Sequence, residues 1–120
     1  MATILIADDT ASEAALMSSV VQKLGHTAQT VTDGEACLAT ARTVKPALIL
    51  LDVVMPKMDG FNTCRKLKKD PDLAHTPVIM VTSKNQDSDK FWAERQGANG
   101  FVVKPFTPDT LAAAIKTFLP

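Results

Sequence analysis

Five short runs of aliphatic residues set the strongest constraint on the fold of this chain. Each run has the length of a β-strand, and most are apolar at every position instead of alternating between apolar and polar residues. A strand can be apolar on both sides only where other elements cover both faces of its sheet, which is typical of parallel sheets. The runs lie at 3–7, 28–31, 47–51, 78–81 and 100–103.

The segments between these runs carry helical patterns. Apolar residues recur with i, i+3, i+4, i+7 spacing at Met17, Val20, Val21 and Leu24, and again from Leu111 to Phe118. Strand and helix therefore alternate five times, which predicts an α/β fold with a parallel sheet and right-handed crossovers. Helix-end signals agree with this division: a capping box from Thr10 to Glu13, Gly25 as a C-terminal cap, Asp59 before a helix over 60–69, Gly97 after a helix over about 87–96, and Thr107-Pro108 before the last helix.

Composition bounds the class of protein. The 120 residues fit one domain spanning 1–120, and their equal numbers of basic and acidic residues, 13 each, argue against a nucleic-acid or anionic-membrane binder. No apolar run reaches the roughly 18 residues of a membrane span, and no basic segment precedes the first run as in a signal peptide. Cys37 and Cys64 lack metal-site spacing, and both are expected to be buried. We expect a reduced, cytoplasmic protein.

Polar residues follow four of the five predicted strands. Ligands of open parallel sheets bind beyond the carboxyl ends of the strands, and the flavodoxin-like strand order 2-1-3-4-5 would make these four strands neighbours. The residues concerned are Asp8 and Asp9 after the first strand, Asp52 after the third, Thr82 and Ser83 after the fourth, and Lys104 and Pro105 after the fifth. The sequence thus predicts a flavodoxin-like (βα)5 fold with one polar cleft.

The residue types in this cleft indicate phosphoryl transfer. Three carboxylates repel one another, and Lys104 compensates only one of the charges. Mg²⁺, which prefers carboxylate, water and phosphate oxygens, would supply the rest. Asp52 could then attack phosphorus as a carboxylate nucleophile. Each feature alone has a plainer interpretation: Asp8-Asp9 as a capping or loop pair, Asp52 as a turn residue, and Lys104 as a surface charge.

Four motifs at this spacing resemble the receiver domain of two-component response regulators, particularly the single-domain CheY-like type. They are "ILIADD" (4–9), "LILLDVVMPKMDG" (48–60), "VIMVTS" (78–83) and "GFVVKPF" (100–106). The resemblance covers the whole chain, and "KNQDSDKFWAERQGA" (84–98) is similar to the small regulators of twitching-motility chemosensory systems.

The resemblance implies a role for each matching residue. Asp52 would accept a phosphoryl group from the phosphohistidine of a CheA-like histidine kinase. Asp8, Asp9, Asp52 and the backbone carbonyl of Val54 would hold Mg²⁺, with Asp9 the more direct ligand of the acidic pair. Thr82 and Lys104 would contact the phosphoryl group, Phe101 would be the aromatic switch residue, and Pro105 would follow a cis peptide bond.

The expected output is protein binding. The face made by the fourth helix, fifth strand and fifth helix would contact an output protein, with no activity beyond phosphotransfer and self-dephosphorylation, and we expect a monomer. Of Phe91 and Trp92, one should face the core, and the basic residues Arg65, Lys66, Lys68 and Lys69 should form a solvated helix face. Alternatives are a phosphate sink for a shared kinase, a haloacid-dehalogenase-type phosphatase and a flavodoxin-like FMN carrier.

Overall fold

A computed structural model describes all 120 residues, and five strands alternate with five helices along the chain. In chain order the elements are β1 (Thr3–Ala7), α1 (Ala11–Lys23), β2 (Thr27–Val31), α2 (Gly34–Val44), β3 (Leu48–Leu51), α3 (Gly60–Lys69), β4 (Val78–Thr82), α4 (Asp87–Arg95), β5 (Gly100–Val103) and α5 (Pro108–Phe118). The predicted alternation is confirmed, with strand boundaries that shift by at most one residue.

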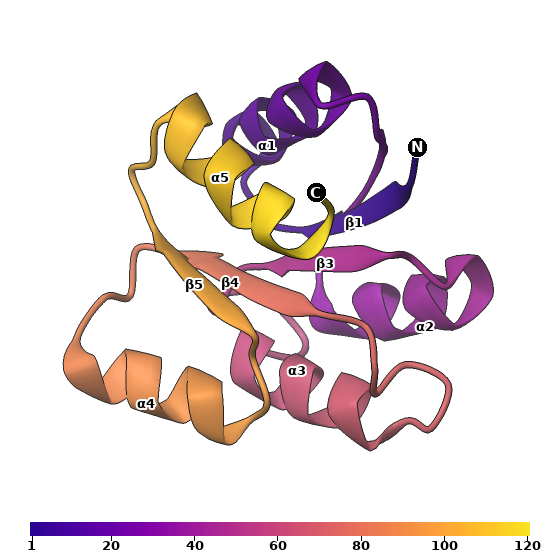
Figure 1. Cartoon of the computed structure of the whole chain (residues 1–120). Helices are drawn as coiled ribbons and strands as arrows, with labels where there is room; N and C mark the ends of the chain where they lie inside the picture. The colour runs from indigo at the N-terminus through magenta and orange to yellow at the C-terminus, as the bar shows by residue number, and fades with distance from the viewer.

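The strands form one parallel sheet in the order β2-β1-β3-β4-β5. Helices α1 and α5 cover one face of this sheet, and α2, α3 and α4 cover the other (Figure 1). The predicted flavodoxin-like (βα)5 fold and its strand order are therefore confirmed. No helix is both long and apolar enough to cross a membrane.

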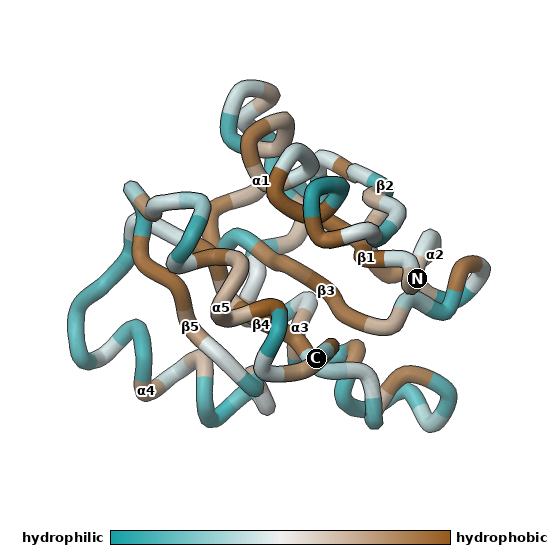
Figure 2. The backbone as a smooth tube through the Cα atoms, turned by 45° about the horizontal axis from the view of Figure 1, so that its top comes forward, coloured by the Kyte–Doolittle hydropathy of each residue, from teal (hydrophilic) through white to brown (hydrophobic).

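Two hydrophobic cores lie on opposite faces of the sheet. Leu5, Ile49, Leu51 and Met80 point toward α2, α3 and α4, whereas their strand neighbours such as Ile6 point toward α1 and α5. The hydropathy colouring of the backbone follows this arrangement, because hydrophobic stretches run along β1, β3, β4 and β5 (Figure 2). Full burial of both sides of a strand explains why these runs are continuously apolar.

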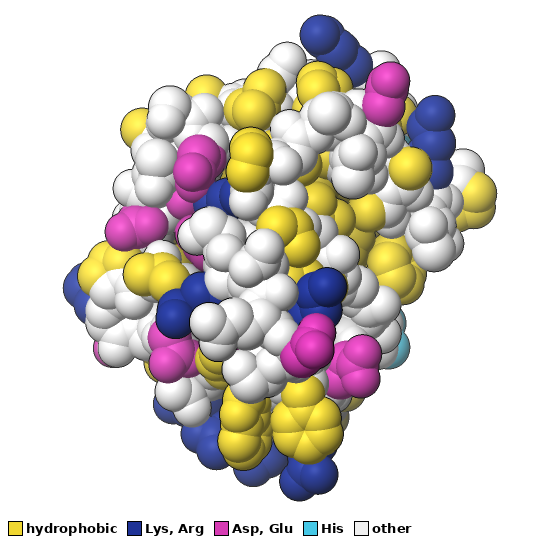
Figure 3. Space-filling model, turned by 90° about the vertical axis from the view of Figure 1, so that its left-hand side faces the viewer, with side chains coloured by type: hydrophobic (Ala, Val, Ile, Leu, Met, Phe, Trp, Pro, Cys, Tyr) yellow, Lys and Arg dark blue, Asp and Glu magenta, His cyan; other side chains and the backbone are white.

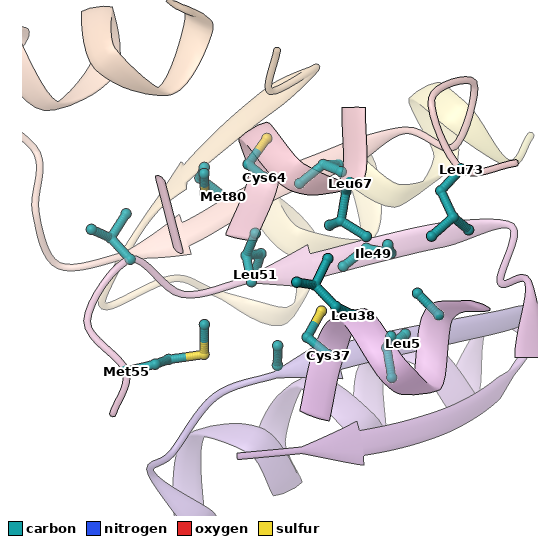
Figure 4. Close-up of a cluster of buried hydrophobic side chains, with 14 of the residues drawn as sticks. Leu5, Cys37, Leu38, Ile49, Leu51, Met55, Cys64, Leu67, Leu73 and Met80 are labelled. Atoms are coloured by element: carbon teal, nitrogen blue, oxygen red, sulfur yellow. The ribbon is translucent and has the colours of Figure 1, made fainter. Parts of the chain in front are cut away.

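The two cysteines belong to the first of these cores. Cys37 on α2 and Cys64 on α3 are fully buried among leucine side chains, as expected for small hydrophobic residues (Figure 4). Burial raises the pKa of Cys37 to about 12 and that of Cys64 to about 11. Both thiols therefore remain protonated near neutral pH.

Most of the predicted helix ends are confirmed, but the capping box of α1 is wrong. Asp59 accepts the backbone N–H of Asn62 at 2.8 Å, and Thr107 accepts that of Thr110 at 3.1 Å. Thr10 occupies the N-cap position of α1 without a side-chain capping bond. Its backbone N–H donates to the carboxylate of Asp8 at 2.9 Å, so Glu13 makes no capping bond and its side chain is available for another partner.

Lys68 also departs from the prediction of a solvated basic face. Its ammonium donates to the carbonyl oxygen of Thr76 at 2.7 Å and to the side-chain oxygen of Asn99 at 2.9 Å. Asn99 in turn accepts the backbone N–H of Val78 at 2.9 Å. Lys68 therefore ties the end of α3 to the loops that precede β4 and β5.

Replacing Lys68 by Met is expected to destabilise the fold by about 1–2 kcal/mol, because the carbonyl of the buried Thr76 loses its ammonium partner and the link to Asn99 is broken. Denaturant unfolding measures the change. Lys69→Met is the matched control, since the exposed Lys69 makes no side-chain hydrogen bond and surface changes usually stay within about 0.5 kcal/mol. Equal stabilities for the two variants would contradict this role of Lys68.

Candidate functional site

Backbone hydrogen bonds hold three of the predicted site residues at the carboxyl edge of the sheet. The N–H of Asp52 donates to the carbonyl of Ala7, and the N–H of Asp8 donates to that of Val31, both at 3.0 Å. The N–H of Lys104 donates to the carbonyl of Thr82 at 2.9 Å. Each bond extends the sheet by one position, so these side chains project from a rigid frame.

The ammonium of Lys104 joins three carboxylates. It donates to Asp8 Oδ2 at 2.6 Å, to Asp52 Oδ2 at 3.2 Å and to Glu13 Oε2 through a short contact. These groups come from the ends of β1, β3 and β5 and from the first turn of α1. Side chains far apart in the sequence therefore meet at one point, as the strand order predicted.

Lys104 and the two aspartates of this cluster are largely removed from solvent, and the cluster carries excess negative charge. The side chain of Lys104 is 8% exposed and that of Asp52 is 9% exposed. Three carboxylates and one ammonium leave a formal charge of −2, and oxygens of all three acids lie within 4.8 Å of one another. Such a set of hard oxygen donors can hold a small divalent cation, which would remove the imbalance.

The pKa values of Asp8 and Lys104 are both raised, but for different reasons. Burial raises the pKa of Asp8 above its usual value, although bonds from Lys104 and the Thr10 N–H offset part of the rise. Burial alone would lower the pKa of Lys104, but its hydrogen bonds to Asp8 and Glu13 and the charge of Asp52 raise that pKa above its ordinary value. Lys104 is therefore a permanent cation in this site.

The other predicted residues surround this cluster. Asp9 follows Asp8 but is exposed and stands outside the group of acids around Lys104. The backbone N–H of Val54 donates to Asp52 Oδ1 at 3.3 Å, and the Val54 side chain is exposed. Thr82 is fully buried, and its hydroxyl oxygen accepts the N–H of Lys84 at 3.3 Å.

Two further predicted residues lie on or beside β5. Phe101 pairs in register with Met80 and is partly buried against the core under α3 and α4. The peptide bond between Lys104 and Pro105 is cis.

Glu13 is the residue of this site that sequence reasoning missed. It occupies the position that predicts a capping-box glutamate, yet its carboxylate contacts Lys104. The available signal was its place in the first turn of the helix after β1, because that turn lies at the same edge of the sheet as Asp8.

A glycine allows α3 to begin directly beside Asp52. The N–H of Gly60 donates to the carbonyl of Val53 at 2.8 Å. A Cβ atom at position 60 would collide with the backbone carbonyl of Asp52 and lie 2.7 Å from the Cα of Val53. Gly60 thus permits the close approach that fixes the loop after β3.

A flavodoxin-like sheet with an acidic cluster and a lysine at its switch point defines the class of this molecule. Comparison with known proteins agrees: the response regulator receiver domain matches residues 4–116. The chain belongs to the response regulator receiver domain family, which favours signalling over the phosphatase and FMN-carrier hypotheses.

Particular relatives differ in how much of their length this chain spans. It is 40% identical over 119 residues to Protein PilH of Pseudomonas aeruginosa, covering 99% of this chain and 98% of PilH. It is 36% identical to the alkaline phosphatase synthesis transcriptional regulatory protein PhoP of Bacillus subtilis, covering 97% of this chain but 48% of PhoP. Among solved structures, chemotaxis protein CheY4 of Vibrio cholerae superposes with a TM-score of 0.93 at 32% identity, covering 98% of both chains. The chain is thus a CheY-like receiver domain similar to PilH.

Proposed function

We propose that this chain is a stand-alone response regulator in which Asp52 accepts a phosphoryl group from a CheA-like histidine kinase. The observation that carries the proposal is the setting of Asp52. Asp52 directly follows β3, whose four residues are all fully buried. Its backbone N–H donates to the carbonyl of Ala7, and one of its carboxylate oxygens lies 3.2 Å from the ammonium of Lys104. A nucleophile held this rigidly needs little reorganisation to reach phosphorus.

The proposed chemistry is a displacement at phosphorus. A carboxylate oxygen of Asp52 attacks the phosphorus of a phosphohistidine, and the P–N bond breaks as the new O–P bond forms. The electron pair of the broken bond leaves with the imidazole, and an acyl phosphate remains on Asp52. Lys104 compensates part of the negative charge that the transferred group brings into the site.

The acidic residues fit a magnesium site. Asp8, Asp9, Asp52 and the backbone carbonyl of Val54 would hold Mg²⁺, and the excess charge of −2 around Lys104 supports a divalent cation. When bound, the ion would supply charge neutralisation for the transferred oxygens.

Asp8→Asn is expected to weaken Mg²⁺ binding by about tenfold or more, because it removes a buried carboxylate oxygen and one negative charge. Calorimetric titration with Mg²⁺ measures the affinity. Asp109→Asn, which neutralises an exposed acid in the first turn of α5, should bind as the unmodified chain does. An unchanged affinity in Asp8→Asn would remove Asp8 from the ligand set.

Incubation with acetyl phosphate and Mg²⁺ is expected to add one phosphoryl group, and Asp52→Asn is expected to abolish this addition. Intact-mass measurement under non-acidic conditions detects the adduct. Asp59→Asn serves as a control because Asp59 lies in the same loop but caps α3. A phosphoryl adduct that persists in Asp52→Asn would show that the acceptor is another residue.

A change of the α4–β5–α5 face would turn phosphorylation into a signal. Thr82 would move toward the phosphoryl group, and Phe101 would occupy the space that Thr82 leaves. Phosphorylation would thereby shift an existing equilibrium between two states of this face. The burial of Thr82 beside the site and the partial burial of Phe101 support this route.

An exposed aromatic pair favours an output switch over a phosphate sink. Phe91 and Trp92 are 53% and 52% exposed, so the expectation that one of them faces the core is wrong. Their rings meet edge to face at 5.8 Å, and Arg95 lies over the Phe91 ring. Hydrophobic side chains protrude from the α4 end of this face, surrounded by charged groups (Figure 3). Exposed aromatics with a charged rim are typical of protein-binding surfaces.

Phosphorylation is expected to alter hydrogen exchange across 87–103, which spans α4 and β5, while α2 keeps its exchange rates. Mass-spectrometric exchange with and without acetyl phosphate measures the difference. The Thr82→Val variant should still be phosphorylated on Asp52. It should lose most of the exchange difference, because valine has the shape of threonine but lacks its hydroxyl. A phosphorylated chain with unaltered exchange over 87–103 would favour the phosphate sink.

A further inference from the structure

The hydrogen bonds of Lys104 use every proton that its ammonium can donate. The group has three N–H bonds, and Asp8, Asp52 and Glu13 each accept one of them. The Lys104 side chain is 8% exposed, so water does little to replace a lost acceptor. The direction of each N–H bond is therefore set by the carboxylates around it.

Glu13 differs from the two aspartates in having no other partner. Asp8 also accepts the Thr10 N–H, and Asp52 also accepts the Val54 N–H. The only side-chain hydrogen bond of Glu13 is the one from Lys104. The capping bond that a glutamate at this helix position ordinarily makes is absent, because the N–H of Thr10 has been taken by Asp8.

We propose that Glu13 is a positioning residue that aims one N–H bond of Lys104 at the reacting end of Asp52. This inference rests on the proposed function of Asp52. Because the three N–H directions of an ammonium are rigidly related, acceptors at Asp8 and Glu13 fix the third direction on Asp52. With a divalent cation bound, Asp8 would be shared with that cation, and Glu13 would remain the one acceptor that serves Lys104 alone.

Two substitutions separate the effect of the negative charge of Glu13 from the effect of its side-chain length. Glu13→Gln keeps the length and loses the charge-assisted bond, whereas Glu13→Asp keeps the charge and shortens the side chain by one methylene group. Both variants should fold, since the Glu13 side chain is 41% exposed and its cap bond is already missing. A charge effect alone would instead let Glu13→Gln attract an anionic phosphodonor and react faster.

The test is the rate of phosphorylation of the full chain by acetyl phosphate with Mg²⁺, followed by intact mass. Glu13→Gln and Glu13→Asp are each expected to slow the reaction by about tenfold, because a misdirected ammonium stabilises the transferred group less well. In a chain that carries Lys104→Met, adding Glu13→Gln should change the rate by less than about twofold. If Glu13 had only a general structural role, Glu13→Gln would slow phosphorylation to the same extent in the chain that lacks Lys104.

Glu35→Gln is the matched control, because Glu35 is an exposed acid in the first turn of α2 and makes no ion pair. Its rate should equal that of the unmodified chain. The proposal is overturned if Glu13→Gln reacts at the unmodified rate or faster, or if it slows the reaction equally with and without Lys104. Asp52→Asn run in parallel keeps the two proposals apart, since its inertness upholds the acceptor whatever Glu13 does.

Discussion

Burial of the central strands on both faces is the constraint from which the rest of this molecule follows. β1, β3 and β4 have no solvent-facing side, so their side chains serve two hydrophobic cores and leave no room for polar chemistry. Polar groups can appear only where a strand ends. The parallel sheet brings those ends to one edge, where the first residues beyond the strands donate their backbone N–H groups to the carbonyls of Ala7, Val31 and Thr82. The stability of the core and the precision of the site thus have the same origin.

The cost of that arrangement is an unbalanced charge. Three carboxylates surround one largely buried ammonium, and such a group is stable only if its charges are compensated. A bound divalent cation would compensate this charge, and a phosphoryl group transferred to Asp52 would add negative charge that the cation and Lys104 could both offset. The same charge imbalance therefore favours the binding of a divalent cation. Lys104 is central because it contacts every acid in the cluster.

The fold was predictable from the sequence because apolar runs and helical spacing are local patterns, each contained in a short stretch of the chain. Asp8, Asp52 and Lys104 were predictable as a group, since each directly follows an apolar run. Glu13 and Lys68 were not, because their partners lie 91 and 31 residues away along the chain, at Lys104 and Asn99. Glu13 fits a capping box equally well on sequence grounds, and only the competing bond from Thr10 to Asp8 decides against it. Side chains whose partners are distant need the three-dimensional arrangement.

The route from the site to the surface is short because β4 and β5 flank α4 in the chain. Thr82 ends β4 beside the acidic cluster, and Phe101 lies on the neighbouring strand opposite Met80. The helix between these strands buries only Ala93 and exposes Phe91 and Trp92 to solvent. An element with so few buried contacts can change position at low cost, whereas α3, which buries four residues, cannot. The helix with the fewest buried residues therefore lies on the face that we propose to change on phosphorylation.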